Sequence, residues 1–60
     1  MNGFIFASEF EKEMLAIRKR YENDPEAMHR AMDNLMITVL RQHGFDAGCD
    51  IFESADKWYT

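Results

Sequence analysis

Two short breaks in an otherwise helix-forming sequence constrain this 60-residue chain more than any other feature. At the first break, Asp24 can cap a helix and Pro25 suits its first position, where no backbone N–H donor is needed. At the second break, Gly44 can take the left-handed conformation that ends a helix, and Asp46 can cap the next one. The breaks predict a single all-α domain over residues 1–60, either a small three-helix bundle or a helical hairpin followed by an amphipathic C-terminal helix. The expected helices span about 8–22, 25–43 and 46–59.

The first segment carries an apolar stripe, because its large apolar side chains recur every three or four residues and so share one side of a helix. Ser8 followed by Glu11 has the spacing of a capping box, which predicts that the helix begins there. Residues 1–7 either extend this helix or pack as an arm. The stripe consists of Phe6, Phe10, Met14, Ile17 and Tyr21.

The second segment is the longest, and we expect it to form the central core helix. Its apolar residues make one broad face with Leu35 near the centre. Ile37 projects to the polar side, where an apolar β-branched residue gains nothing unless another surface covers it. Ile37 therefore marks either a second contact surface or a single exposed side chain. The broad face consists of Met28, Ala31, Met32, Leu35, Met36, Val39 and Leu40.

The third segment is amphipathic. Phe45 stands where a Schellman motif places an apolar residue that folds back on the preceding helix, here onto Leu40. Gly48 costs the following helix about 1 kcal/mol relative to alanine, so either the first turn frays or a neighbouring backbone approaches closely. An apolar side of the helix is expected to include Ile51, Phe52, Trp58 and Tyr59, and the opposite side to carry the acidic residues Asp46, Asp50 and Glu53.

Size and composition indicate that the chain associates with other chains. A 60-residue domain buries only about 60% of the surface of its unfolded chain, whereas 47% of these residues are hydrophobic. We therefore expect a homo-oligomer, a dimer or larger. Trp58 and Tyr59 are expected to pack against the second helix or a second subunit, and with Ile37 they are the candidate apolar contacts.

Charge and cysteine content argue against several classes of protein. The net charge of −4 disfavours direct nucleic-acid binding, and the helix dipole accounts for the basic run at 18–20 at the end of the first helix. No apolar run reaches the length of a membrane span or a signal peptide. Cys49 has no intramolecular disulfide partner, so we expect a cytoplasmic protein.

The residues with reactive side chains form only a weak pattern. His29 and Asp33 stand one helical turn apart, and a metal site would need His43 and Cys49 to converge on them. A weak metal-binding protein is therefore an alternative, while a partly buried His29 and a buried Cys49 are favoured. The sequence contains no phosphate-binding loop or catalytic triad pattern, so we expect neither an enzyme nor a bound cofactor.

The acidic residues of the third segment are the candidate partner-binding site. Asp46, Asp50 and Glu53 recur along one face of the predicted helix. Such a row imitates the phosphates of a nucleic acid and suits a basic surface on another protein, whereas most such rows are solvated helix faces.

The last third of the chain resembles a pattern found in small acidic proteins encoded by phages and prophages. The shared features are glycine, an aromatic residue and aspartate at 44–46, then Gly48, and a short amphipathic helix that closes in 57–60 with Lys-Trp-Tyr-Thr. The resemblance implies an accessory role in which the protein binds and blocks a host protein, such as a host defence complex. It transfers no functional residue, and a structural homo-oligomer without inhibitory activity is the alternative.

Overall fold

The computed structural model describes residues 5–55, and this part of the chain contains three helices and no strand. The all-α prediction is therefore confirmed. The predicted starts agree with the observed ones to within one residue, but the third helix ends well before residue 59, and Trp58 and Tyr59 lie outside the described residues. The helices are α1 (Ala7–Arg20), α2 (Pro25–Gln42) and α3 (Asp46–Ser54).

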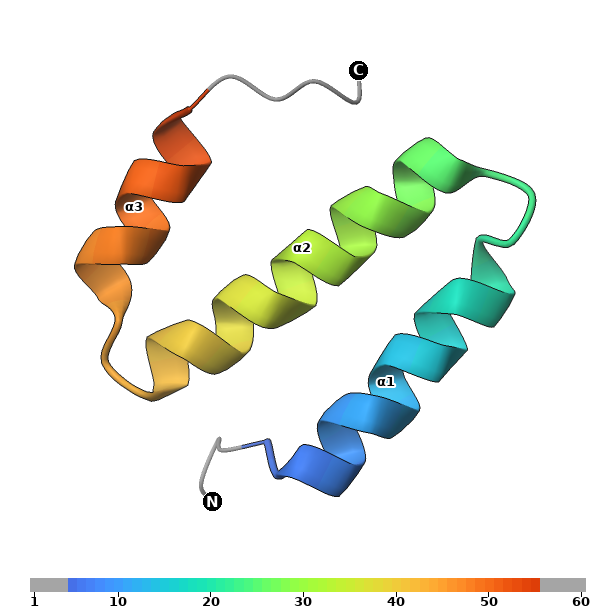
Figure 1. The fold of residues 1–60 in the computed structure, drawn as a ribbon, viewed down its shortest axis with the longest axis horizontal. Coiled ribbons are helices and arrows are strands. Elements are labelled where there is room, and N and C mark those ends of the chain that lie inside the picture. The colour runs from blue at the N-terminus through green and yellow to red at the C-terminus, as the bar shows by residue number, and fades with distance from the viewer. Residues whose placement is uncertain (1–4, 56–60) are drawn as a thin grey trace.

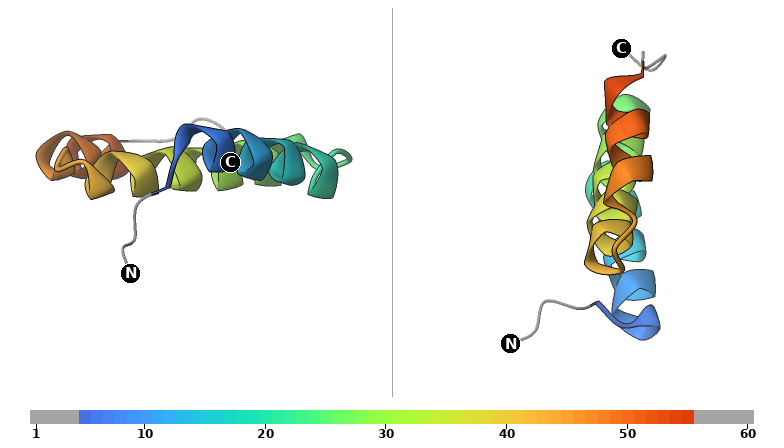
Figure 2. Two further views of the ribbon diagram at one scale, coloured as in Figure 1. Left: turned by 90° about the horizontal axis from the view of Figure 1, so that it is seen from below. Right: turned by 90° about the vertical axis from the view of Figure 1, so that its left-hand side faces the viewer.

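The three helices lie side by side in one layer with α2 in the middle (Figures 1 and 2). α2 packs against both neighbours, whereas α1 and α3 do not contact each other. The molecule measures 33 × 29 × 14 Å, and its shortest dimension is close to the width of one helix with its side chains. Of the two predicted arrangements, the hairpin followed by a third helix describes this layer.

Local signals place both turns as predicted. The Asp24 side chain accepts a hydrogen bond from the Ala27 N–H at 3.2 Å, and Pro25 occupies the first helical position. Gly44 has a φ of +87° and its N–H donates to the Arg41 carbonyl at 3.0 Å. The Phe45 N–H donates to the Leu40 carbonyl at 3.0 Å, which completes the Schellman motif.

The predicted capping box of Ser8 and Glu11 is wrong, because the cap of α1 lies two residues earlier, at Phe6. Phe6 is the residue that precedes the helix, and its N–H donates to the Glu9 carboxylate at 3.2 Å. The N–H of Ile5 donates to the side-chain oxygen of Gln42 at 2.9 Å. This bond ties the residue before the cap of α1 to the end of α2, and at the cap itself Glu9 takes the part predicted for Glu11.

The role predicted for Asp46 as a helix cap is also wrong. Phe45 is the residue that precedes α3, and Asp46 is already inside its first turn. The Asp46 carboxylate instead accepts a hydrogen bond from the Arg41 guanidinium at 3.1 Å. The Asp46 carboxylate therefore pairs with a charged side chain on α2 and does not cap the backbone of α3.

A single layer leaves little of the chain buried. Among the described residues only Ile37 and Cys49 are buried, with 8% and 2% of their surfaces exposed, and both lie where α2 meets α3. Leu35, expected near the centre of the core, is only half-buried. The α1 stripe is half-buried at Phe10, Met14, Ile17 and Tyr21, whereas Phe6, which precedes the helix, is exposed.

Replacement of Ile37 by alanine should lower the free energy of unfolding by about 2 to 5 kcal/mol, because it removes one of the two buried side chains and leaves a cavity between α2 and α3. Ile51→Ala is the matched control, since Ile51 is 71% exposed and loses little burial. Urea denaturation followed by circular dichroism measures both. Equal effects of the two substitutions would contradict the burial of Ile37.

Candidate functional site

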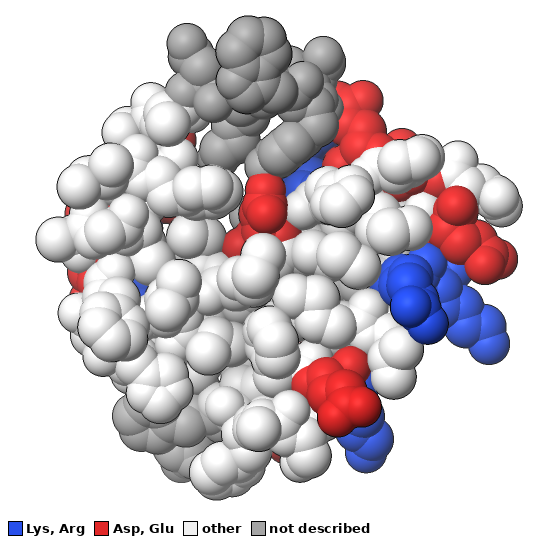
Figure 3. Space-filling view, viewed as in Figure 1, with Lys and Arg blue, Asp and Glu red and all other residues white. Residues whose placement is uncertain are grey.

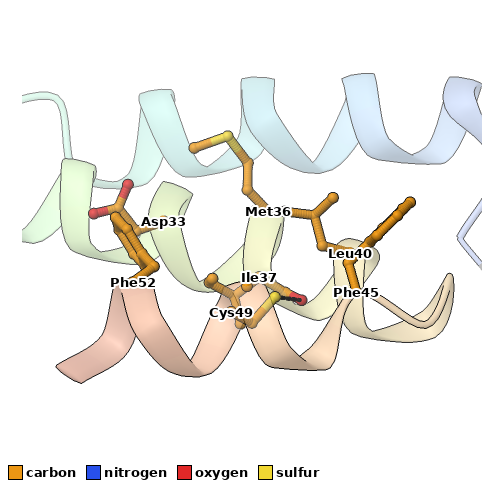
Figure 4. Close-up of a pocket in the computed structure, with 8 residues that line it drawn as sticks. Asp33, Met36, Ile37, Leu40, Phe45, Cys49 and Phe52 are labelled. Atoms are coloured by element: carbon orange, nitrogen blue, oxygen red, sulfur yellow. Dashed lines mark hydrogen bonds between the residues drawn. The ribbon is translucent and has the colours of Figure 1, made fainter. Parts of the chain in front are cut away.

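An apolar groove lies between α2 and α3 on one face of the layer (Figure 4). It has a volume of about 280 Å³ and is open to solvent. Two buried residues form part of its lining, and the Cys49 thiol donates a long hydrogen bond of 3.9 Å to the Ile37 carbonyl. The groove is lined by Asp33, Met36, Ile37, Leu40, Phe45, Gly48, Cys49 and Phe52.

Helical spacing and the Schellman turn bring these side chains together. Met36 and Leu40 stand one turn apart on α2, and Phe45 follows the turn that connects α2 to α3. Gly48 and Phe52 are one turn apart on α3. The groove therefore depends on the turn at Gly44, which folds α3 back along α2.

Four large apolar side chains around the groove remain exposed to solvent. The exposed fractions are 41% for Met36, 43% for Leu40, 60% for Phe45 and 42% for Phe52. We call these four residues the apolar face. Seen from the side of Figure 1, most of the surface over α2 and α3 is uncharged, and charged side chains gather along the α1 side (Figure 3).

Gly48 keeps part of the groove open. A Cβ atom built on Gly48 meets nothing within 4 Å, so no neighbouring backbone in the described part of the chain requires a glycine there. Residue 48 lies inside α3, which excludes the frayed first turn that the sequence suggested. Gly48 therefore lowers the helix propensity of α3 without a packing reason within the chain, and it leaves a hollow on the apolar side.

The three acidic residues predicted as a partner site form an acidic stripe around Arg41. The guanidinium Nη1 lies 3.1 Å from Asp46 Oδ1, and Nη2 lies 2.8 Å from both Asp50 Oδ1 and Glu53 Oε1. Hydrogen bonds to Asp50, Glu53 and Asp46 raise the pKa of Arg41 above its ordinary value, so its charge is fixed. Three negative charges and one positive charge leave the cluster a formal charge of −2.

The apolar groove and the acidic stripe lie on opposite sides of the α2–α3 contact. On α2, Met36 and Arg41 project to either side of Ile37 at 100° per residue. On α3, Phe52 and Asp50 flank the buried Cys49 in the same way. The two surfaces can therefore contact different partners.

The structure also locates the other residues that the sequence singled out. α3 of the same chain covers Ile37, so its apolar contact is made inside the monomer. Within residues 5–55, His29, Asp33, His43 and Cys49 do not converge, since no three metal-binding side chains of the His, Cys, Asp or Glu type form a group there. No helix in the described range has the length and hydropathy needed to cross a membrane.

Sequence reasoning missed Arg41 and the apolar face. Arg41 was assigned no role from the sequence, although a cation in the last turn of a helix just before a tight turn suits an acidic stripe on the next helix. Met36 and Leu40 were assigned to the core because they continue the periodicity of Leu35. The position of Ile37 is the signal that distinguishes Met36 and Leu40 from core residues. As an apolar residue, Ile37 needs another helix to cover its own side of α2.

Comparisons with protein-family models, curated proteins and solved structures found no match to this chain. The resemblance to small phage and prophage proteins therefore stays a prediction.

Replacement of Arg41 by glutamine should lower the urea midpoint, because three carboxylates lose their shared cation and repel one another. Arg30→Gln is the matched control, since Arg30 makes one ion pair of 2.7 Å with Glu26 within α2. The difference between the two variants should shrink in 1 M NaCl, where charges are screened within about 3 Å. A salt-independent difference would contradict an electrostatic role.

Replacement of Gly48 by alanine should raise the free energy of unfolding by about 1 kcal/mol, because alanine favours the helix and its methyl group enters open space. Gly44→Ala should have the opposite effect, since residue 44 has a φ of +87°. Chemical denaturation in dilute protein compares them. The comparison is made on the monomer, at protein concentrations too low for self-association, and destabilisation by both substitutions there would contradict the open space beside Gly48 within one chain.

Proposed function

We propose that this chain is a non-enzymatic interaction protein that binds protein through its apolar face. One observation carries the proposal: four large apolar side chains stay exposed around a groove in a fold one layer thick. Helical domains normally bury such side chains against a second layer of secondary structure. A protein surface laid over the groove supplies that layer.

The extent of the apolar face supports this proposal. With about 200 Å² for each fully exposed large side chain, the four residues leave roughly 400 Å² of apolar surface in contact with solvent. Patches of roughly 300 to 600 Å² are the largest on typical monomers and are often functional. The four residues form such a patch around a single groove.

The chemistry of the groove favours contact over catalysis. Among the described residues of its lining Asp33 is the one carboxylate, and the thiol of Cys49 is buried in the floor. A general acid or base must lie within hydrogen-bond reach of the proton that it transfers, and the described lining offers one carboxylate and one buried thiol for that role. The buried thiol also suits a reducing cytoplasm.

A second candidate function uses the acidic stripe. The side chains of Asp46 and Asp50 are 62% and 70% exposed even though both contact Arg41. They can therefore accept further cations from a basic protein surface, as expected of a small phage accessory protein that blocks a host protein. Arg41 weakens this candidate because it already neutralises part of the stripe.

Photocrosslinking in living bacterial cells tests which surface contacts protein. p-Benzoylphenylalanine in place of Phe45 or Phe52 should yield crosslinked species, because both side chains border the groove. The same group at Lys12, exposed on α1, is the control. Crosslinks from Glu53 alone would support the acidic stripe instead, and no crosslink from either surface would contradict both candidates.

A further inference from the structure

We infer that the protein covering the apolar face is a second copy of this chain, packed face to face about a two-fold axis that passes close to Met36. The inference rests on the proposed function, since it names the partner of the same surface. Three properties of the described residues support it: the apolar area, the distribution of charge, and the shape of the groove.

The apolar area agrees with what a dimer of this size needs. A standard interface buries about 800 Å² on each partner, and somewhat more than half of that area is apolar. The apolar face offers roughly 400 Å² from its four large side chains alone. Two such layers in contact form the two-layer helical core that one copy lacks.

The distribution of charge favours a copy of the same chain on this face. Each chain has a net charge of −4, so two copies repel unless they meet through a surface with few charges. The face seen in Figure 3 is such a surface over α2 and α3. The acidic stripe and Arg41 lie on the other side of the α2–α3 contact and stay in solvent when two apolar faces meet.

The shape of the groove is self-complementary. Phe45 is 60% exposed at the rim, and Gly48 leaves a hollow beside it with open space where a Cβ would stand. Because a two-fold interface uses the same patch on both copies, each copy provides both the protruding ring and the hollow that receives it. Glycine commonly occurs where another chain approaches closely.

The position of the axis follows from the order of the helices. α2 is the middle helix and carries Met36 and Leu40 of the apolar face, so an axis near its centre brings the apolar faces of the two copies together (Figure 1). Met36 is the exposed apolar residue nearest the centre of α2. A residue close to a two-fold axis contacts its own counterpart.

Sedimentation equilibrium of the purified 60-residue chain tests the inference with a matched pair of variants. Met36 and Thr38 are both exposed on α2 and project about 200° apart, on opposite faces of the layer. Wild type and Thr38→Lys should sediment at twice the 7.1 kDa monomer mass at micromolar concentration. Met36→Lys should sediment as a monomer with unchanged helicity, because its ammonium group would be buried in the interface.

Disulfide crosslinking keeps the inference testable if Met36→Lys does not fold. Met36→Cys is a mild change and should form a disulfide-linked dimer under air oxidation, because the two copies of residue 36 lie near the axis. Wild type is the control, since its Cys49 is buried and only 2% exposed. Thr38→Cys should stay monomeric on a non-reducing gel.

Several results would overturn the inference. A wild-type monomer at all concentrations would leave the apolar face to a foreign protein or to residues 56–60 of the same chain. A dimer that survives Met36→Lys but not Thr38→Lys would place the interface on the other face. Crosslinks from Phe45 or Phe52 in cells to a foreign protein, together with a monomeric pure chain, would preserve the proposed function and reject self-association.

Discussion

The contact between Ile37 and Cys49 is the interaction on which the rest of this small structure depends. These are the buried side chains of the described region, and they hold α3 against α2. Because α3 is fixed along this line, Phe52 and Gly48 turn towards one face of the layer, and Asp50 towards the other. This one apolar contact therefore sets the orientation of both the apolar face and the acidic stripe.

The ion pairs of Arg41 also hold α3 against α2, on the side opposite to the apolar groove. They are exposed, and the contribution of such pairs to stability is small in water. Their geometric effect is larger, since one guanidinium contacts carboxylates on successive turns of α3 and so limits rotation of that helix about its own axis. The orientation of the groove lining therefore has both an apolar and an ionic determinant.

Local signals in the sequence predicted the helices and both turns. Asp24 with Pro25, and Gly44 with Phe45, act through bonds within a few residues, so their outcome depends little on the rest of the chain. The site was harder to predict because helical periodicity gives the direction of a side chain and not the neighbour that meets it. Ile37 and Met36 illustrate the failure: the position of α3 buries the first and leaves the second exposed, and that position depends on contacts between distant residues.

The exposed thioether of Met36 makes the apolar face sensitive to oxidation. Its side chain is 41% exposed and stands at the edge of the groove. Peroxide converts an accessible methionine into its sulfoxide, which is polar and disrupts methionine-rich contacts until a reductase restores it. Oxidation of Met36 would therefore weaken the proposed binding at this face, and a partner bound as proposed would shield the sulfur from oxidation.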